Sequence, residues 1–163
     1  MNSEKSYHSR GGFFAIVLCI IIPLAIGWLA SFLTKNSQVA FVRMAKPPLA
    51  PPAWLFPIVW TLMYVLMGIA FYFIYISESE IRSGAITLYI IQLIFNFAWC
   101  IIFFRNGTYW FAAAWLFVLW LMIVCLILLC TAISKAATWL LVPYLLWCTY
   151  AFYLNIGIAI LNK

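Results

Sequence analysis

Five long apolar runs, separated by short polar or basic segments, organise this chain. The runs that contain no Asp, Glu, Lys or Arg cover residues 13–34, 53–77, 84–104, 106–134 and 136–162. A helix that crosses the hydrocarbon core of a bilayer needs about 20 apolar residues. A membrane β-barrel would instead show alternation with a period of two over strands of about ten residues. The pattern therefore predicts an all-α integral membrane protein, a bundle of five transmembrane helices.

The polar segments between the runs predict the organisation of the chain. Residues 1–12 form a polar, basic tail, and residues 13–163 form one membrane domain whose longest connection is 35–52. The last two connections are very short, so the helices they join should be antiparallel neighbours. The tail and first run could together be a secretory signal, but the run is too long for a signal core. We expect an uncleaved first span.

Composition excludes a soluble protein, because 69% of the residues are hydrophobic and 7% are charged, against about 25% charged in soluble domains. The net charge of +6 comes from cations at the span ends, where they anchor helices at the lipid interface and set orientation. We therefore expect lipid contacts and no nucleic-acid partner. One side holds Lys5, Arg10, Arg82 and Lys135, and the other holds Lys35, Arg43, Lys46, Arg105 and Lys163. This small difference favours a cytoplasmic 35–52 segment.

Asp, Glu, Lys, Arg and His are missing from all five runs, and the single histidine, His8, lies in the tail. Acid–base catalysis and proton-coupled transport both need such groups near the reacting or transported species. We therefore expect no conventional catalytic residues, metal site or cofactor. The five cysteines lie within spans and form no CxxC motif, which is typical of small packing residues.

Aromatic residues recur at helical spacing in three of the runs. The stripes are Trp60, Tyr64, Met67 and Phe71; Gln92, Asn96, Trp99 and Phe103; and Tyr144, Trp147, Ala151 and Leu154, with Asn155 beside the last. An amide exposed to lipid costs several kcal/mol, so the side chains of Gln92 and Asn96 should face the bundle interior. There they could bond neighbouring helices or fix a ligand in an aromatic pocket. Separately, Gly27 and Ser31 form a small-xxx-small pair that could support a homodimer.

Three stretches resemble the TspO/MBR translocator protein family, once called peripheral benzodiazepine receptors. They are KPPLAPPAWLFPIVWTLMYVLMGIA at 46–70, LYIIQLIFNFAWCIIFF at 88–104 and LLVPYLLWCTYAFYLN at 140–155. Their order and spacing match the family's proline loop, second, third and fifth spans. The chain departs at Leu49, where relatives often have Trp, and it lacks the basic residue that the animal cholesterol motif places soon after Tyr153.

The resemblance implies a five-helix bundle with a pocket for porphyrins or other tetrapyrroles. Its ligand contacts would be Trp60, Tyr64, Asn96, Trp99, Trp147 and Ala151. The prolines Pro47, Pro48, Pro51 and Pro52 give the loop few conformations, so we interpret it as a rigid lid, with a plain spacer as the alternative.

The resemblance, taken together with the residue patterns, implies three possible functions. The first is a receptor or transporter-like protein that binds porphyrins. The second is light-dependent porphyrin breakdown involving Trp60 and Trp147, in which the chromophore and oxygen supply the chemistry. The third is a structural scaffold or stress-response regulator. In the absence of a recognisable transit peptide we expect a bacterial cell membrane, with the mitochondrial outer membrane as the alternative.

Overall fold

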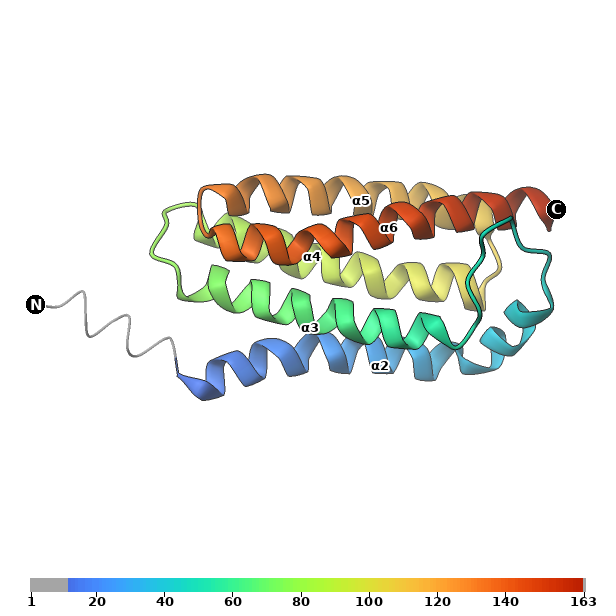
Figure 1. Cartoon of the computed structure of the whole chain (residues 1–163), viewed down its shortest axis with the longest axis horizontal. Helices are drawn as coiled ribbons and strands as arrows, with labels where there is room; N and C mark the ends of the chain where they lie inside the picture. Colours follow the sequence, from blue (N-terminus) through green and yellow to red (C-terminus); the bar gives the residue numbers. More distant parts are fainter. Residues whose placement is uncertain (1–11, 163) are drawn as a thin grey trace, which may run out of the picture.

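Five long helices run along a common axis in the part of the chain that the structure describes, residues 12–162 (Figure 1). Side chains are described for these residues except 36–43. In this computed structural model the helices are α2 (Phe13–Arg43), α3 (Leu55–Ile76), α4 (Arg82–Cys100), α5 (Tyr109–Thr131) and α6 (Lys135–Leu161). Each contains a stretch long and apolar enough to cross a membrane. The predicted all-α bundle of five transmembrane helices is confirmed; the predicted tail falls almost entirely outside the described residues.

Helix α2 is longer than the hydropathy pattern predicted. Its apolar span ends at Lys35, but the helix continues to Arg43. Residues 36–43 include neither proline nor glycine, the two residues that disfavour a helix most strongly. The backbone therefore stays helical through the polar residues 35–38 that end the apolar run. The connection to α3 covers residues 44–54, and the expectation of a loop over 35–52 is wrong for its first nine positions.

Helix α4 ends in a π-helical turn, η1 (Ile101–Arg105). The backbone N–H of Asn106 donates to the carbonyl of Ile101, five residues earlier, at 3.1 Å. A π turn widens the helix locally and is often found at functional sites. Here it packs against α2 and turns Phe103 into the core.

Helix α2 lies at the edge of the bundle. Only 17% of its most apolar stretch is buried, against 33–39% in the other four spans. Its closest backbone contact is with Gly68 of α3: a Cβ atom placed on Gly68 would lie 2.6 Å from the Cα of Ile20 and 2.7 Å from the carbonyl oxygen of Cys19. Pro23, inside α2, has no N–H to offer this same carbonyl. The backbones of α2 and α3 are thus in close contact at Cys19 and Ile20, in the N-terminal half of α2.

Gly68→Ala tests that contact. The added methyl group meets backbone rather than a movable side chain, and overpacking of this kind costs about 1–3 kcal/mol. We expect a lower thermal unfolding temperature in detergent, followed by circular dichroism. Gly84→Ala is the matched control, because nothing lies within 4 Å of its new Cβ. Equal effects of the two substitutions would contradict the assigned contact.

Candidate functional site

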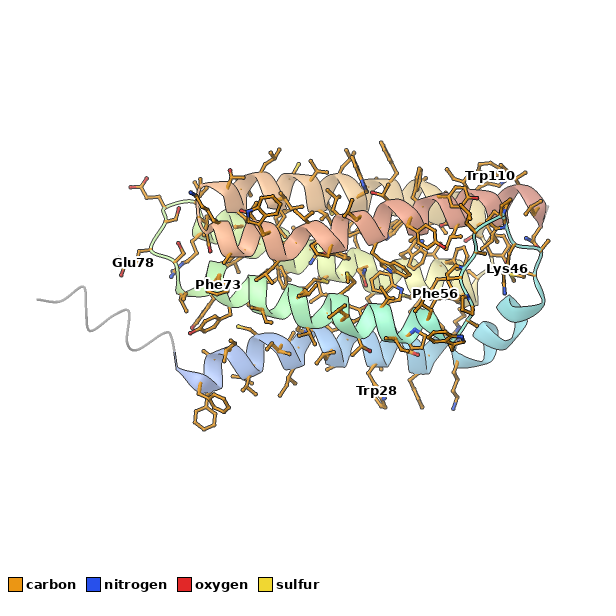
Figure 2. The ribbon with its side chains drawn as sticks, in the orientation of Figure 1. Trp28, Lys46, Phe56, Phe73, Glu78 and Trp110 are labelled. Atoms are coloured by element: carbon orange, nitrogen blue, oxygen red, sulfur yellow. The ribbon has the colours of Figure 1, made fainter. Side chains whose placement is uncertain are left out.

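A cluster of aromatic rings surrounds Trp60 of α3. Its ring centroid lies 5.6 Å from that of Tyr64, 6.2 Å from Trp99, 6.4 Å from Tyr144 and 6.4 Å from Trp147. These rings come from α3, α4 and α6, so the three aromatic stripes meet at one place inside the bundle. Trp60 and Trp147 are both partly buried, and their planes are nearly perpendicular at 87°. Neither ring belongs to the outward-facing belt that Trp28 represents in Figure 2, where that side chain points away from the bundle.

A chain of hydrogen bonds holds part of this cluster in place. The hydroxyl of Tyr64 donates to Asn96 Oδ1 at 2.7 Å, and Asn96 Nδ2 donates to the hydroxyl of Tyr144 at 3.1 Å. The Tyr144 hydroxyl in turn donates to Gln92 Oε1 at 3.0 Å. Gln92 and Asn96 have no exposed surface, which agrees with the expectation that both amides face the bundle interior. The chain ties α3, α4 and α6 together and fixes the orientation of the Tyr64 ring.

A third buried amide, Asn155 of α6, makes an equivalent link. Its Oδ1 accepts from Trp99 Nε1 at 3.1 Å, and its Nδ2 donates to the carbonyl of Tyr109 at 2.9 Å. It therefore joins α6 to both α4 and α5. By contrast, the indole Nε1 of Trp147 is a buried donor without a hydrogen-bond partner among the described residues. Leaving a buried donor unpaired costs free energy, so a ligand acceptor that bonded to this atom would remove that cost.

A cavity of about 130 Å³ lies beside the cluster, between α2, α3 and the end of α4. Its walls are mostly apolar, with aromatic rings on the α3 and η1 side and small residues on the α2 side. The lining residues are Gly27, Ala30, Ser31, Thr34, Ala53, Phe56, Pro57, Trp60, Tyr64, Cys100 and Phe104. Binding sites for drug-sized ligands usually have about 300–1,000 Å³. The cavity as it stands admits a single ring, and a larger ligand requires its walls to move.

The predicted ligand residues divide around this cavity. Trp60 and Tyr64 line it, whereas Trp99 and Ala151 line a separate void of about 20 Å³. Trp147 contacts the ring of Phe56 at 6.0 Å. Asn96 lines neither space and lies behind Tyr64, to which it is bonded. The candidate site is thus closer to α2 than the sequence pattern indicated.

Two rings separate the cavity from the smaller void. Phe56 and Phe104 belong to the lining of both spaces. Figure 2 shows Phe56 at the start of α3, close to the end of the bundle that holds the connecting segment. Rotation of these two side chains would join the spaces and bring Trp99 and Ala151 into one site with Trp60.

The sequence pattern did not indicate that residues of α2 line the pocket. Gly27, Ala30, Ser31 and Thr34 follow i, i+3, i+4, i+7 spacing and share a helix face. We considered Gly27 and Ser31 as a dimer contact, but in the structure both face the cavity of their own chain. A Cβ atom on Gly27 would lie 2.1 Å from the ring of Tyr64. Small residues at this spacing are a signal for close approach, and they do not say whether the neighbour is another chain.

The proline segment is attached to α6. The hydroxyls of Tyr150 and Tyr153 donate to the carbonyls of Leu49 and Pro48 at 2.6 and 2.7 Å. Asn162 donates to the carbonyl of Ala45 at 2.8 Å and accepts from its N–H at 3.1 Å. Figure 1 shows the segment passing from α2 to the C-terminal end of α6 before it reaches α3.

The segment also packs closely on α6 through its first proline. Pro47 presses on Gly157, where a Cβ atom would lie 2.6 Å from the proline ring. Pro47, Pro48, Pro51 and Pro52, which we assigned to a lid, do not line the cavity; Ala53 and Pro57 do. Leu49 is 85% exposed and has a left-handed backbone with φ of 66°. The Tyr150 hydroxyl bonds to the carbonyl of this residue.

Comparison with known proteins gives a consistent result. A model of the TspO/MBR family matches residues 19–161. The chain is 36% identical over 151 residues to the tryptophan-rich protein TspO of Chlorobaculum tepidum, covering 90% of this chain and 95% of that protein. It is 35% identical over 120 residues to the tryptophan-rich sensory protein of Cereibacter sphaeroides, covering 74% and 75%. It is 29% identical over 139 residues to the translocator protein of Bos taurus, covering 83% and 82%. The bacterial relatives agree with the expected bacterial cell membrane.

The hydrogen-bond chain behind Tyr64 predicts a specific stability pattern. Asn96→Leu leaves the buried hydroxyl of Tyr64 without its partner, at a cost of about 1–3 kcal/mol, while the Tyr144 hydroxyl keeps its bond to Gln92, so the unfolding temperature should fall. Adding Tyr64→Phe to Asn96→Leu removes one stranded hydroxyl and should recover part of the loss. Thermal unfolding of the two variants in detergent measures the difference. A double variant that is less stable than Asn96→Leu would contradict the assigned bond.

Proposed function

This chain belongs to the TspO/MBR family of integral, multi-pass membrane proteins, and on that premise we propose that it is a receptor or transporter-like protein for a flat, largely apolar ligand such as a porphyrin. The observation that carries the proposal is the position of the cavity. One wall consists of Trp60 and Tyr64, in contact with further rings, and the opposite wall consists of small residues of α2. This arrangement suits a planar ligand that stacks on aromatic rings.

The size of the cavity sets how such a ligand would bind. A dry cavity of about 150 Å³ holds a molecule the size of benzene, so the 130 Å³ present here accepts one ring of a macrocycle. The remainder would occupy the space opened by rotation of Phe56 and Phe104. That rotation would expose the indole of Trp147, whose unpaired N–H suits a carboxylate or carbonyl acceptor on the ligand.

In this proposal the six predicted residues have different roles. Trp60 and Tyr64 contact the ligand from the start, and Trp99, Trp147 and Ala151 contact it once the two phenylalanines have moved. Asn96 positions the ring of Tyr64 through its hydrogen bond and does not itself contact the ligand. This division differs from a pocket in which the amide binds the ligand directly.

Binding of protoporphyrin IX tests the proposal. We expect saturable binding in detergent, followed by the shift of the porphyrin absorption band. Trp60→Ala combined with Trp147→Ala should weaken it at least tenfold, because both ring contacts are lost. The matched control is Trp28→Ala with Trp139→Ala, two exposed indoles, which should leave the affinity unchanged. No saturable binding by the unmodified protein, or an equal effect of both pairs, would reject the site.

A second candidate function is light-driven oxidation of a bound porphyrin by dioxygen. It is favoured by the contacts of Trp60 with the indoles of Trp99 and Trp147, since neighbouring indoles are readily oxidised. Under this function, illumination in air should consume several porphyrins per protein, and Trp60→Phe should slow the loss. Loss of no more than one porphyrin per protein, or equal loss in the dark, would exclude it.

A further inference from the structure

The mouth of the cavity lies along the seam between α2 and α3. Among the lining residues the exposed ones are Ser31 of α2 and Ala53 and Pro57 at the start of α3. Those on the α4 and η1 side, Cys100 and Phe104, are only partly exposed. Ser31 lies within the apolar span of α2, four residues before its last residue, Lys35, so this part of the seam lies at the level of the acyl chains.

The proline segment is poorly suited to act as the entrance. Its residues 45–49 are held on α6 by Tyr150, Tyr153 and Asn162, and Pro47 presses on Gly157 of the same helix. Opening the cavity at this end would break these contacts together. The four prolines also lie away from the cavity lining. The segment therefore has the contacts of a fixed strap.

Helix α2 has the features of a movable wall. Pro23, which is buried in the middle of the membrane-spanning part, removes one helical hydrogen bond from the carbonyl of Cys19. Prolines inside helices are the usual positions of kinks. On the N-terminal side of Pro23, Gly68 of α3 touches the backbone of Cys19 and Ile20. On its C-terminal side, the α2 residues facing α3 are small and border the cavity. The close backbone contact with Gly68 and the cavity thus lie on opposite sides of Pro23 along α2.

The other end of the movable part is also held. After Arg43 the chain is tethered by the paired bonds between Ala45 and Asn162. The hydroxyl of Tyr109 also donates to the sulfur of Met44 at 3.4 Å. The part of α2 between Pro23 and this tether can bow outward between two fixed points, and such a movement would widen the seam at Ser31.

We propose that α2 is a lateral gate hinged at Pro23, through which a ligand dissolved in the bilayer enters between α2 and α3. This inference rests on the proposed function and specifies its ligand class, a molecule that partitions into the acyl region of the bilayer. Such a molecule would reach the site directly from the lipid, without entering it from the aqueous phase beside residues 44–54. Association then depends on the concentration of the ligand in the membrane.

The test uses the full chain in lipid nanodiscs, mixed with vesicles that contain protoporphyrin IX, with binding followed in a stopped-flow instrument. Pro23→Ala restores the helical hydrogen bond and stiffens the hinge. We expect it to slow association and dissociation at least threefold each while the Kd stays within twofold. Tyr150→Phe with Tyr153→Phe loosens the strap and should leave both rates within twofold. Faster exchange in the strap variant, with unchanged rates in Pro23→Ala, would overturn the proposal.

A second pair of variants tests the mouth itself. Ser31→Trp narrows the seam and should slow both rates, whereas Leu29→Trp on the same helix, at an exposed position outside the cavity, should not. Nanodiscs of two lipid compositions that take up different amounts of porphyrin at the same aqueous concentration should show association rates in proportion to their porphyrin content. Saturable binding whose association and dissociation rates are unaffected by Ser31→Trp and by the porphyrin content of the membrane would reject the lateral gate but leave the proposed function standing. The absence of saturable binding by the unmodified protein would reject the proposed function and the gate together.

Discussion

An amide inside a bilayer has to find its hydrogen-bond partners within the protein, and much of this structure follows from that constraint. Gln92, Asn96 and Asn155 are almost completely buried. Their partners are two tyrosine hydroxyls, an indole N–H and a backbone carbonyl on neighbouring helices. Of the amide atoms in these three side chains, Gln92 Nε2 has no partner among the described residues. Apolar contacts between helices gain little over contacts with lipid, so these directed bonds decide which faces of α3, α4, α5 and α6 meet.

The candidate site depends on the same bonds. Because Tyr64 is held from behind by Asn96, its ring presents a fixed wall to the cavity, and Trp60 packs against that ring. Helix α2 shares little of this network and is the least buried span. The cavity lies at the boundary between four helices that share buried hydrogen bonds and a fifth helix, α2, that is less buried. A site at such a boundary can have a preorganised wall and still admit a ligand larger than its resting volume.

The sequence predicted those properties that depend on local pattern. Hydropathy located the five spans, and helical spacing placed Trp60, Trp99 and Trp147 each on an aromatic face of its own helix. Their meeting in one pocket was implied by the family resemblance. The hydropathy pattern misplaced the end of α2, because hydropathy measures solubility in lipid, and a polar segment without proline or glycine can still be helical. The attachment of the proline segment was not foreseen either. Tyr150 and Leu49 are 101 residues apart, and no local pattern indicates such a pairing.

The pocket was only partly foreseen for a related reason. Aromatic stripes reveal rings that share a face, but the empty space beside them depends on the opposite wall. Here that wall is the small-residue face of α2, whose partner the sequence does not specify. Asn96 had been grouped with the ligand contacts on the family resemblance, yet its Oδ1 and Nδ2 are each bonded to a tyrosine hydroxyl.

A structure of the protein in lipid nanodiscs with protoporphyrin IX bound would show whether the cavity beside Trp60 is the ligand site. We expect the macrocycle between α2 and α3, one edge against Trp60 and Tyr64, with Phe56 rotated away and Asn96 still bonded to Tyr64. A porphyrin on the outer, lipid-facing surface, with the Trp60 cluster and the cavity unchanged, would contradict this expectation.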